Sequence, residues 1–335
     1  MASPAGPVFT LQGKITAGAL LAGVLLALWM ESFSPKPGPS AGSAPGPGTE
    51  TCERVVCLSP ALVEIVFDMG AGRRVAGVPD FLFGPPAARS LPRVGGAFNP
   101  NLERILSLQP DFLLFQGRSA KVRAFALRHG IPFPDPPLEL DTLEDLFGAY
   151  WRLGLLFRIP ERAEEAAHRL RSSLARTAAK GFSAGPPVPV FLALGHREGT
   201  LAGIYTATDK TFLGEIARVA GGAGVFASAP GTWPQVSLES VQAREPEVIL
   251  DFHPGEAVRE EALLEDWKEA LPGLPAVREK RVYILTQKFL LMPGPRAAET
   301  AEVLFRLLHP ADRKKLGEGK EGHGKNKERS RGSRR

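Results

Sequence analysis

A long helical pattern near the middle of the chain, with alternating strand and helix patterns on either side, constrains the fold most strongly. Residues 161–180 read ERAEEAAHRLRSSLARTAAK and contain neither glycine nor proline, which favours a rigid helix over 161–179. A second helical pattern, 142–157, precedes it and ends at Ile159-Pro160. We therefore expect a helical rod that joins two separately folded lobes.

Both flanking regions alternate short apolar runs with helical spacing, which is typical of mostly parallel sheets. The predicted strands are 54–58, 74–78, 111–115, 188–194, 247–252 and 281–285. The predicted helices outside the rod are 60–69, 102–108, 121–129, 210–220, 238–243 and 297–308. The predicted fold class is α/β, with two Rossmann-like lobes, a long interlobe helix and a ligand cleft between the lobes.

The ends of the chain differ in composition from the body. Residues 15–30 carry no charge and would form a helix about 24 Å long, so we read 1–32 as a signal peptide or an N-terminal membrane anchor. The predicted remainder is a Pro/Gly/Ser linker over 33–52, an N-terminal α/β lobe over 53–138, a helical segment over 139–181, a C-terminal α/β lobe over 188–310 and a basic disordered tail over 311–335.

The formal charge of +5 belongs to the tail, because residues 311–335 hold ten Lys/Arg against four Asp/Glu. The body is close to neutral, so we expect no nucleic-acid partner. Two cysteines, Cys52 and Cys57, lie five residues apart in an apparent strand. An extended chain would hold them about 16 Å apart, which is beyond disulfide distance.

Two segments resemble each other at an offset of 136 residues, NPNLERILSLQPDFLL (99–114) and QVSLESVQAREPEVIL (235–250). Each reads as a polar cap, a short helix with an acidic first turn, a proline and a buried strand. The acidic residues are Glu103 and Glu239. They either complement the helix N-termini or form a matched pair of charges for basic sites on a partner, and the two roles are compatible.

Aromatic side chains stand in Gly/Pro-rich loops after the predicted strands, where open α/β sheets bind ligands. Each ring can serve packing alone, but several facing a cleft would suit a large flat ligand. Arg296, just before the last helix, either meets an anionic ligand group or caps that helix. The candidate ligand-binding residues are Phe81, Phe83, Phe98, Tyr205, Trp233, Phe289 and Arg296.

Two enzyme signatures are missing from the sequence: there is no H-E-x-x-H and no C-x-x-C. We therefore predict no catalytic residues, no intrinsic cofactor and no protein metal site. The alternative from another class is a metal-dependent enzyme or chelatase with His196 and His253 as metal ligands. A sensor or scaffold without a permease is the third interpretation.

Four segments together resemble the substrate-binding proteins of ABC importers for ferric siderophores, haem and cobalamin. They are RVVCLSPALVEIVFDMGAGRRVAGV, LPRVGGAFNPNLERILSLQPDFLL, TWPQVSLESVQAREPEVIL and MPGPRAAETAEVLFRLLHP. The resemblance implies a bilobal monomer that binds one metal chelate between its lobes and delivers it to an ABC permease and its ATPase. It also implies that Glu103 and Glu239 dock with permease arginines.

The W-P-Q-V-S stretch is most similar to the cobalamin-binding branch, in which its tryptophan, here Trp233, flanks the corrin ring. Phe81 stands where that branch has a tyrosine. A tryptophan that the branch has before N-L-E is replaced here by Ala97, next to Phe98. The resemblance therefore implies a corrinoid ligand, with a ferric siderophore or haem as alternatives, and a location in the bacterial cell envelope.

Overall fold

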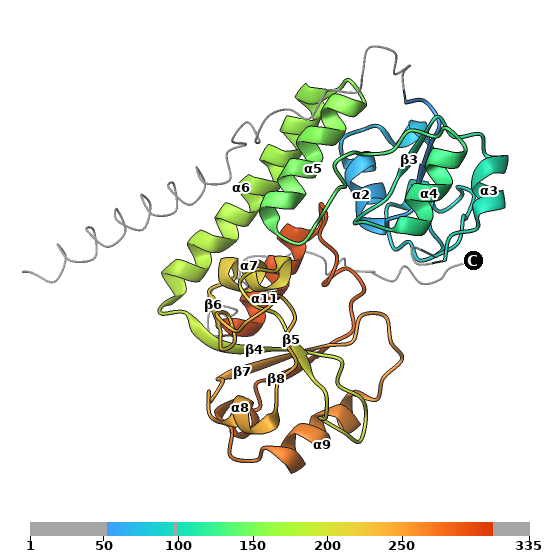
Figure 1. Cartoon of the computed structure of the whole chain (residues 1–335). Coiled ribbons are helices and arrows are strands. Elements are labelled where there is room, and N and C mark those ends of the chain that lie inside the picture. Colours follow the sequence, from blue (N-terminus) through green and yellow to red (C-terminus); the bar gives the residue numbers. More distant parts are fainter. Residues whose placement is uncertain (1–51, 97–98, 311–335) are drawn as a thin grey trace, which may run out of the picture.

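The computed structural model describes residues 52–96 and 99–310, which form two sheet-containing halves connected by helices (Figure 1). In the first half the strand order is β2-β1-β3, and β1 pairs with both neighbours in parallel. The α2 helix begins at Pro60, after Ser59, whose side chain accepts a hydrogen bond from the Leu62 N–H. The elements are β1 (Val55–Cys57), α2 (Pro60–Asp68), β2 (Val75–Gly77), α3 (Leu102–Ser107), β3 (Phe112–Leu114) and α4 (Ala120–Arg128).

The second half is built around β4 (Val188–Leu194), which pairs in parallel with β7 along most of its length. The sheet order is β5-β4-β7-β8, and β6 also pairs with β4. Only β5 runs antiparallel to its neighbour. The other elements are β5 (Tyr205–Thr206), α7 (Phe212–Val219), β6 (Gly222–Gly224), α8 (Leu238–Gln242), β7 (Val248–Phe252), α9 (Glu260–Ala270), α10 (Pro275–Arg278) and β8 (Val282–Leu285).

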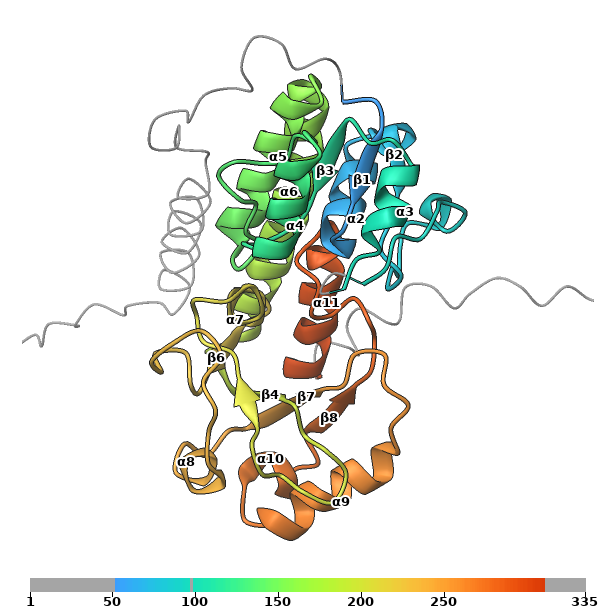
Figure 2. The ribbon, with the colours of Figure 1, turned by 45° about the vertical axis from the view of Figure 1, so that its right-hand side comes forward.

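Three helices connect the halves: α5 (Leu143–Leu156), α6 (Pro160–Ala184) and α11 (Ala297–Leu308). Figure 2 shows α6 running from beside the first sheet to the edge of the second, with α11 alongside. The buried positions of α6 recur every three or four residues and are mostly small, so neighbouring helices can approach closely. They are Ala163, Ala166, Ala167, Leu170, Leu174, Thr177 and Gly181.

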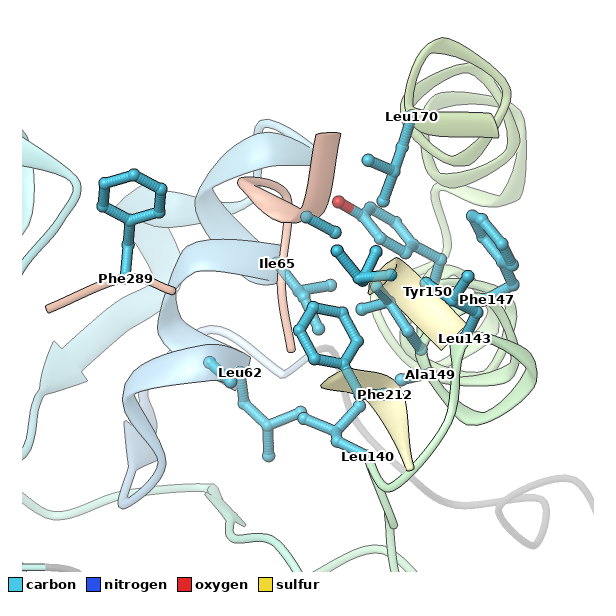
Figure 3. Close-up of a cluster of buried hydrophobic side chains, with 14 of the residues drawn as sticks. Leu62, Ile65, Leu140, Leu143, Phe147, Ala149, Tyr150, Leu170, Phe212 and Phe289 are labelled. Atoms are coloured by element: carbon cyan, nitrogen blue, oxygen red, sulfur yellow. The ribbon is translucent and has the colours of Figure 1, made fainter. Parts of the chain in front are cut away.

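One hydrophobic cluster runs through all of these helices and reaches both sheets. Figure 3 shows part of this cluster. Leu62 and Ile65 of α2 belong to it, as do Tyr150 of α5 and Phe212 of α7. The Tyr150 hydroxyl is buried with them and donates a 2.6 Å hydrogen bond to the Asp68 carboxylate. The two halves therefore share one hydrophobic cluster, and each half also has a smaller cluster of its own.

Hydrogen bonds connect α7 to the start of α5. The backbone N–H of Leu143 donates to the Glu215 carboxylate at 2.6 Å, and the N–H of Phe212 donates to the carbonyl of Asp141. Burial raises the pKa of Glu215, although the Leu143 N–H opposes this shift. An acidic side chain of the second half thus stabilises the N-terminus of a helix of the connecting segment.

The predicted fold class is confirmed, and the predicted strands and helices lie within a few residues of the observed ones. The main boundary error is at α6, which continues to Ala184 past the predicted end at Ala179. Gly181 lies inside the helix, and the absence of a side chain there lets the backbone of Gly221 approach closely. No prediction was made for α9, although Leu263 and Trp267, its two buried side chains, have the spacing of one helical face.

Within residues 52–96 and 99–310, no helix is both long and apolar enough to cross a bilayer. The predicted segments 1–32 and 311–335, nearly all of the 33–52 linker, and Phe98 lie outside the described residues. Cys52 and Cys57 are both buried and are not joined by a disulfide, in agreement with the distance expected from their spacing. Burial raises the pKa of Cys57 to about 12, so this thiol is un-ionised and unreactive at neutral pH.

Replacing Gly181 with alanine should destabilise the protein, because the new Cβ would lie 2.9 Å from the Gly221 nitrogen. We expect a loss of about 1–3 kcal/mol in the free energy of unfolding, measured by urea denaturation. Gly148→Ala in α5 is the matched control. Its Cβ would meet nothing within 4 Å, so it should stabilise by roughly 0.5–1 kcal/mol through helix propensity. Equal effects of the two substitutions would contradict the close helix contact.

Candidate functional site

The two copies of the sequence repeat form equivalent units, α3 followed by β3 and α8 followed by β7. The side chains of Asn101 and Ser237 accept hydrogen bonds from backbone N–H groups in the first turns. Glu103 and Glu239 lie in these turns, and both are exposed. Hydrogen bonds from the Ser237 hydroxyl and from its own N–H hold the pKa of Glu239 below its ordinary value. Each half therefore presents a carboxylate at the same structural point.

Four of the predicted aromatic residues are exposed, two in each half: Phe81, Phe83, Tyr205 and Trp233. The sequence analysis predicted that Tyr205 lies in a loop, and this is wrong. Tyr205 lies in β5, where it pairs with Leu194 at the edge of the sheet. It also forms a β-bridge with Gln235, which brings it near the segment that carries Trp233. Exposed aromatic rings are able to stack on flat ligands.

The loop that carries Phe83 contacts the segment between β8 and α11. The Lys288 ammonium lies 5.0 Å from the centre of the Phe83 ring, a cation–π contact between the halves. The side chain of Lys288 also lies against Gly255, where an added Cβ would be 2.9 Å from it. Lys288 was not identified from the sequence, because its partners lie far away in the chain.

Beneath this contact, Glu64 of α2 is 6% exposed, and its Oε1 has no hydrogen-bond partner. An added Cβ at Gly84 or Gly294 would lie 3.0 or 3.6 Å from its carboxylate oxygens. Burial raises the pKa of Glu64, against the opposing charge of Arg296. A buried acid thus lies where a loop of each half meets α2. The sequence signal was a single charge in the apolar run PALVEIVF.

Phe289 corrects one expectation. Its ring is only 8% exposed and belongs to the cluster that contains Leu62 and Ile65 (Figure 3). The guanidinium of Arg296 lies 3.8 Å from the ring centre, so it covers one face. Arg296 also donates to the Glu299 carboxylate at 2.9 and 3.3 Å, and its side chain makes no capping hydrogen bond to α11. Phe289 is therefore a core residue rather than an exposed contact surface.

The two histidines of the alternative interpretation come together around Asp251, at the ends of β4 and β7. His196 Nδ1 lies 2.6 Å from one oxygen of Asp251, and His253 Nε2 lies 3.0 Å from the other. Burial alone would raise the pKa of Asp251, but the hydrogen bonds with these histidines hold it below its ordinary value. The hydrogen bond to Asp251 raises the pKa of His253.

Comparison with known proteins shows the family of this chain. The sequence model of the family described as periplasmic binding protein matches residues 55–289. The chain is 30% identical over 293 residues to the vitamin B12-binding protein of Photorhabdus laumondii, which covers 86% of this chain and 95% of that protein.

Solved structures are similar in fold. The periplasmic vitamin B12 binding protein BtuF of Vibrio cholerae has a TM-score of 0.63 at 26% identity, covering 78% of this chain and 98% of that one. The periplasmic heme-binding protein RhuT from Roseiflexus sp. RS-1 has a TM-score of 0.65 at 24% identity, with coverage of 77% and 98%. The second likeness concerns the fold alone.

Replacing Glu64 with glutamine should stabilise the protein at pH 7 and have little effect at pH 4. Because the folded-state pKa of Glu64 is raised, wild-type stability falls as pH rises from the unfolded-state pKa through the folded-state pKa. We expect E64Q to gain about 1 kcal/mol at pH 7, or roughly 2–4 °C in Tm. Thermal denaturation at both pH values measures this gain. E103Q, at an exposed acid, is the control, and an equal gain for E64Q at both pH values would contradict the burial argument.

Proposed function

The chain belongs to the periplasmic binding protein family, and from this premise we propose that it captures a corrinoid between its two halves. Members of this family are binding components rather than enzymes, so the chain is the substrate-binding component of an ABC importer for a metal chelate. Its family places it outside the cytoplasm. Nothing in the family or its relatives supports the enzyme or chelatase interpretation.

The observation that carries the corrinoid assignment is the pair of exposed rings, Tyr205 and Trp233, in a chain whose 30% identical relative is named for vitamin B12 binding. Aromatic side chains bury large area and stack on flat macrocycles. Phe81 and Phe83 supply equivalent surface from the first half. Haem is also flat, but the haem-binding protein described above supports only the fold.

The shared core favours a preformed site. Because α2, α5 and α7 pack in one cluster, the loops that carry the rings are held at a set separation before the ligand arrives. A rigid ligand that enters a rigid site loses little conformational entropy, so more of the contact energy is available as affinity. We propose that Glu64 lies at the floor of this site.

Three finer features complete the proposal: the oligomeric state, the N-terminal segment and docking to the permease. We propose that the protein works as a monomer and that the uncharged segment 15–30 either tethers it to the membrane or directs its export. The Pro/Gly/Ser-rich residues 33–52 would then act as a spacer between membrane and body. Glu103 and Glu239 would dock with basic residues of the permease.

The ligand is tested by titrating the full-length protein with cyanocobalamin, haem and a ferric siderophore, and following tryptophan fluorescence. We expect saturable one-to-one binding of cyanocobalamin at micromolar concentration or below. Trp233→Ala should weaken it roughly tenfold through loss of stacking. Trp151→Ala in α5 is the matched control, because the two tryptophans are 46% and 45% exposed. Binding of haem or siderophore alone would refute the corrinoid assignment, and binding of none would refute capture.

Docking is tested by reversing the two charges, Glu103→Lys and Glu239→Lys, in one protein. Because complementary charges guide association, uptake of labelled cyanocobalamin by cells should fall by roughly tenfold or more, while the affinity of the purified protein for its ligand is unchanged. Glu261→Lys is the control, since Glu261 is an exposed acid in the first turn of α9, outside the repeat. Normal uptake by the double variant would show that these carboxylates have no docking role.

A further inference from the structure

A cluster of ionisable side chains lies inside the second half. His196 follows β4, Asp251 lies in β7 and His253 comes directly after β7. All three are almost fully buried, with exposures of 2%, 0% and 2%. Burying three ionisable groups costs free energy unless each has a hydrogen-bond partner or a bound ion. The convergence of these three side chains therefore suggests a specific role.

The three side chains offer one ligand atom each, and these atoms lie within 4.8 Å of one another. His196 Nδ1 and His253 Nε2 approach opposite oxygens of the Asp251 carboxylate. The Trp267 indole donates to the same carboxylate at 2.9 Å and so fixes its orientation. Two imidazole nitrogens and a carboxylate oxygen are a common ligand set for Zn²⁺ and related divalent transition metals.

The far side of each imidazole gives a second, independent indication. The other ring nitrogen of His196 lies 3.0 Å from the Asp266 carboxylate, and that of His253 lies 3.6 Å from the Glu256 carboxylate. Histidines that bind metals usually donate their second N–H to a carboxylate or carbonyl, which sets the tautomer and raises ligand basicity. Asp266 is itself held by the Gly199 N–H at 2.8 Å.

From this arrangement we propose that His196, Asp251 and His253 bind one zinc-like divalent ion. Metal binding would release to solvent the proton between each histidine and Asp251, while Asp266 would accept from the outer ring nitrogen of His196. A fourth position of a tetrahedral ion would be left for water.

The ion would join the segment after β4 to the segment after β7. The first of these, residues 195–204, leads directly into β5 and Tyr205. Binding would therefore hold one wall of the proposed ligand site in place. This inference does not rest on the identity of the transported chelate, because the cluster lies within the second half rather than between the halves.

The test uses the full-length protein, stripped with a chelator and then titrated with Zn²⁺ against a chromophoric competitor. We expect wild type to bind one equivalent more than His253→Gln or Asp251→Asn. His168→Asn is the matched control, since His168 is exposed on α6, and it should bind as wild type does. Asp266→Asn should keep the site but weaken it 10–100-fold, as loss of an outer carboxylate does.

Zn²⁺ should also raise the Tm of wild type and His168→Asn but not that of His253→Gln. Should the His253 or Asp251 variants fail to fold, Co²⁺ bound to wild type decides the question. Visible absorption bands of four-coordinate Co²⁺ would support the site, and their absence would overturn it. Equal Zn²⁺ stoichiometry in wild type and a folded His253→Gln would also overturn it, and would identify the cluster as a hydrogen-bond network only.

Discussion

The two halves of this protein are held together by one apolar cluster that extends from α2 through α5 and α6 to α7 and α11. Separating the halves would expose this surface to water, and the cost scales with the apolar area involved. The hydrophobic effect is not directional. Hydrogen bonds at the margin of the cluster, from the Leu143 N–H to Glu215 and from the Tyr150 hydroxyl to Asp68, fix the orientation of the packed elements. The relative position of residues that contact each other across the two halves depends on this shared cluster.

Several features of the candidate site follow from the shared hydrophobic cluster. Glu64 is buried because α2 is covered by a loop from each half, near Gly84 and Gly294. Lys288 reaches Phe83 because the segment after β8 passes the first half on its way to α11. We propose that a site assembled in this way is largely formed before the ligand arrives. Such a site would suit a binding protein that takes up a ligand and releases it to a permease, because neither step would require extensive refolding.

The secondary structure was predictable because its signals are local. Periodic apolar residues, the capping serine before Pro60 and the proline and glycine stops located most strands and helices to within a few residues. The acidic pair Glu103 and Glu239 was also predictable, because each copy of the repeat is one unbroken stretch of sequence. Phe289 misled the sequence analysis because a ring in a Gly/Pro-rich stretch looks exposed, whereas its environment is set by α2 and Arg296.

By itself, the sequence determined the α/β class, the long connecting helix, the exposed acids at the two helix starts and the family resemblance. Only the tertiary structure decided that Gly181 would lie inside α6 rather than end it, that Glu64 would be buried, and that His196 would meet Asp251 and His253. The physical reason is the range of the interactions. Helix and strand preferences act between residues a few positions apart, whereas these contacts require the parallel pairing of β4 with β7 and the packing of both halves on shared helices.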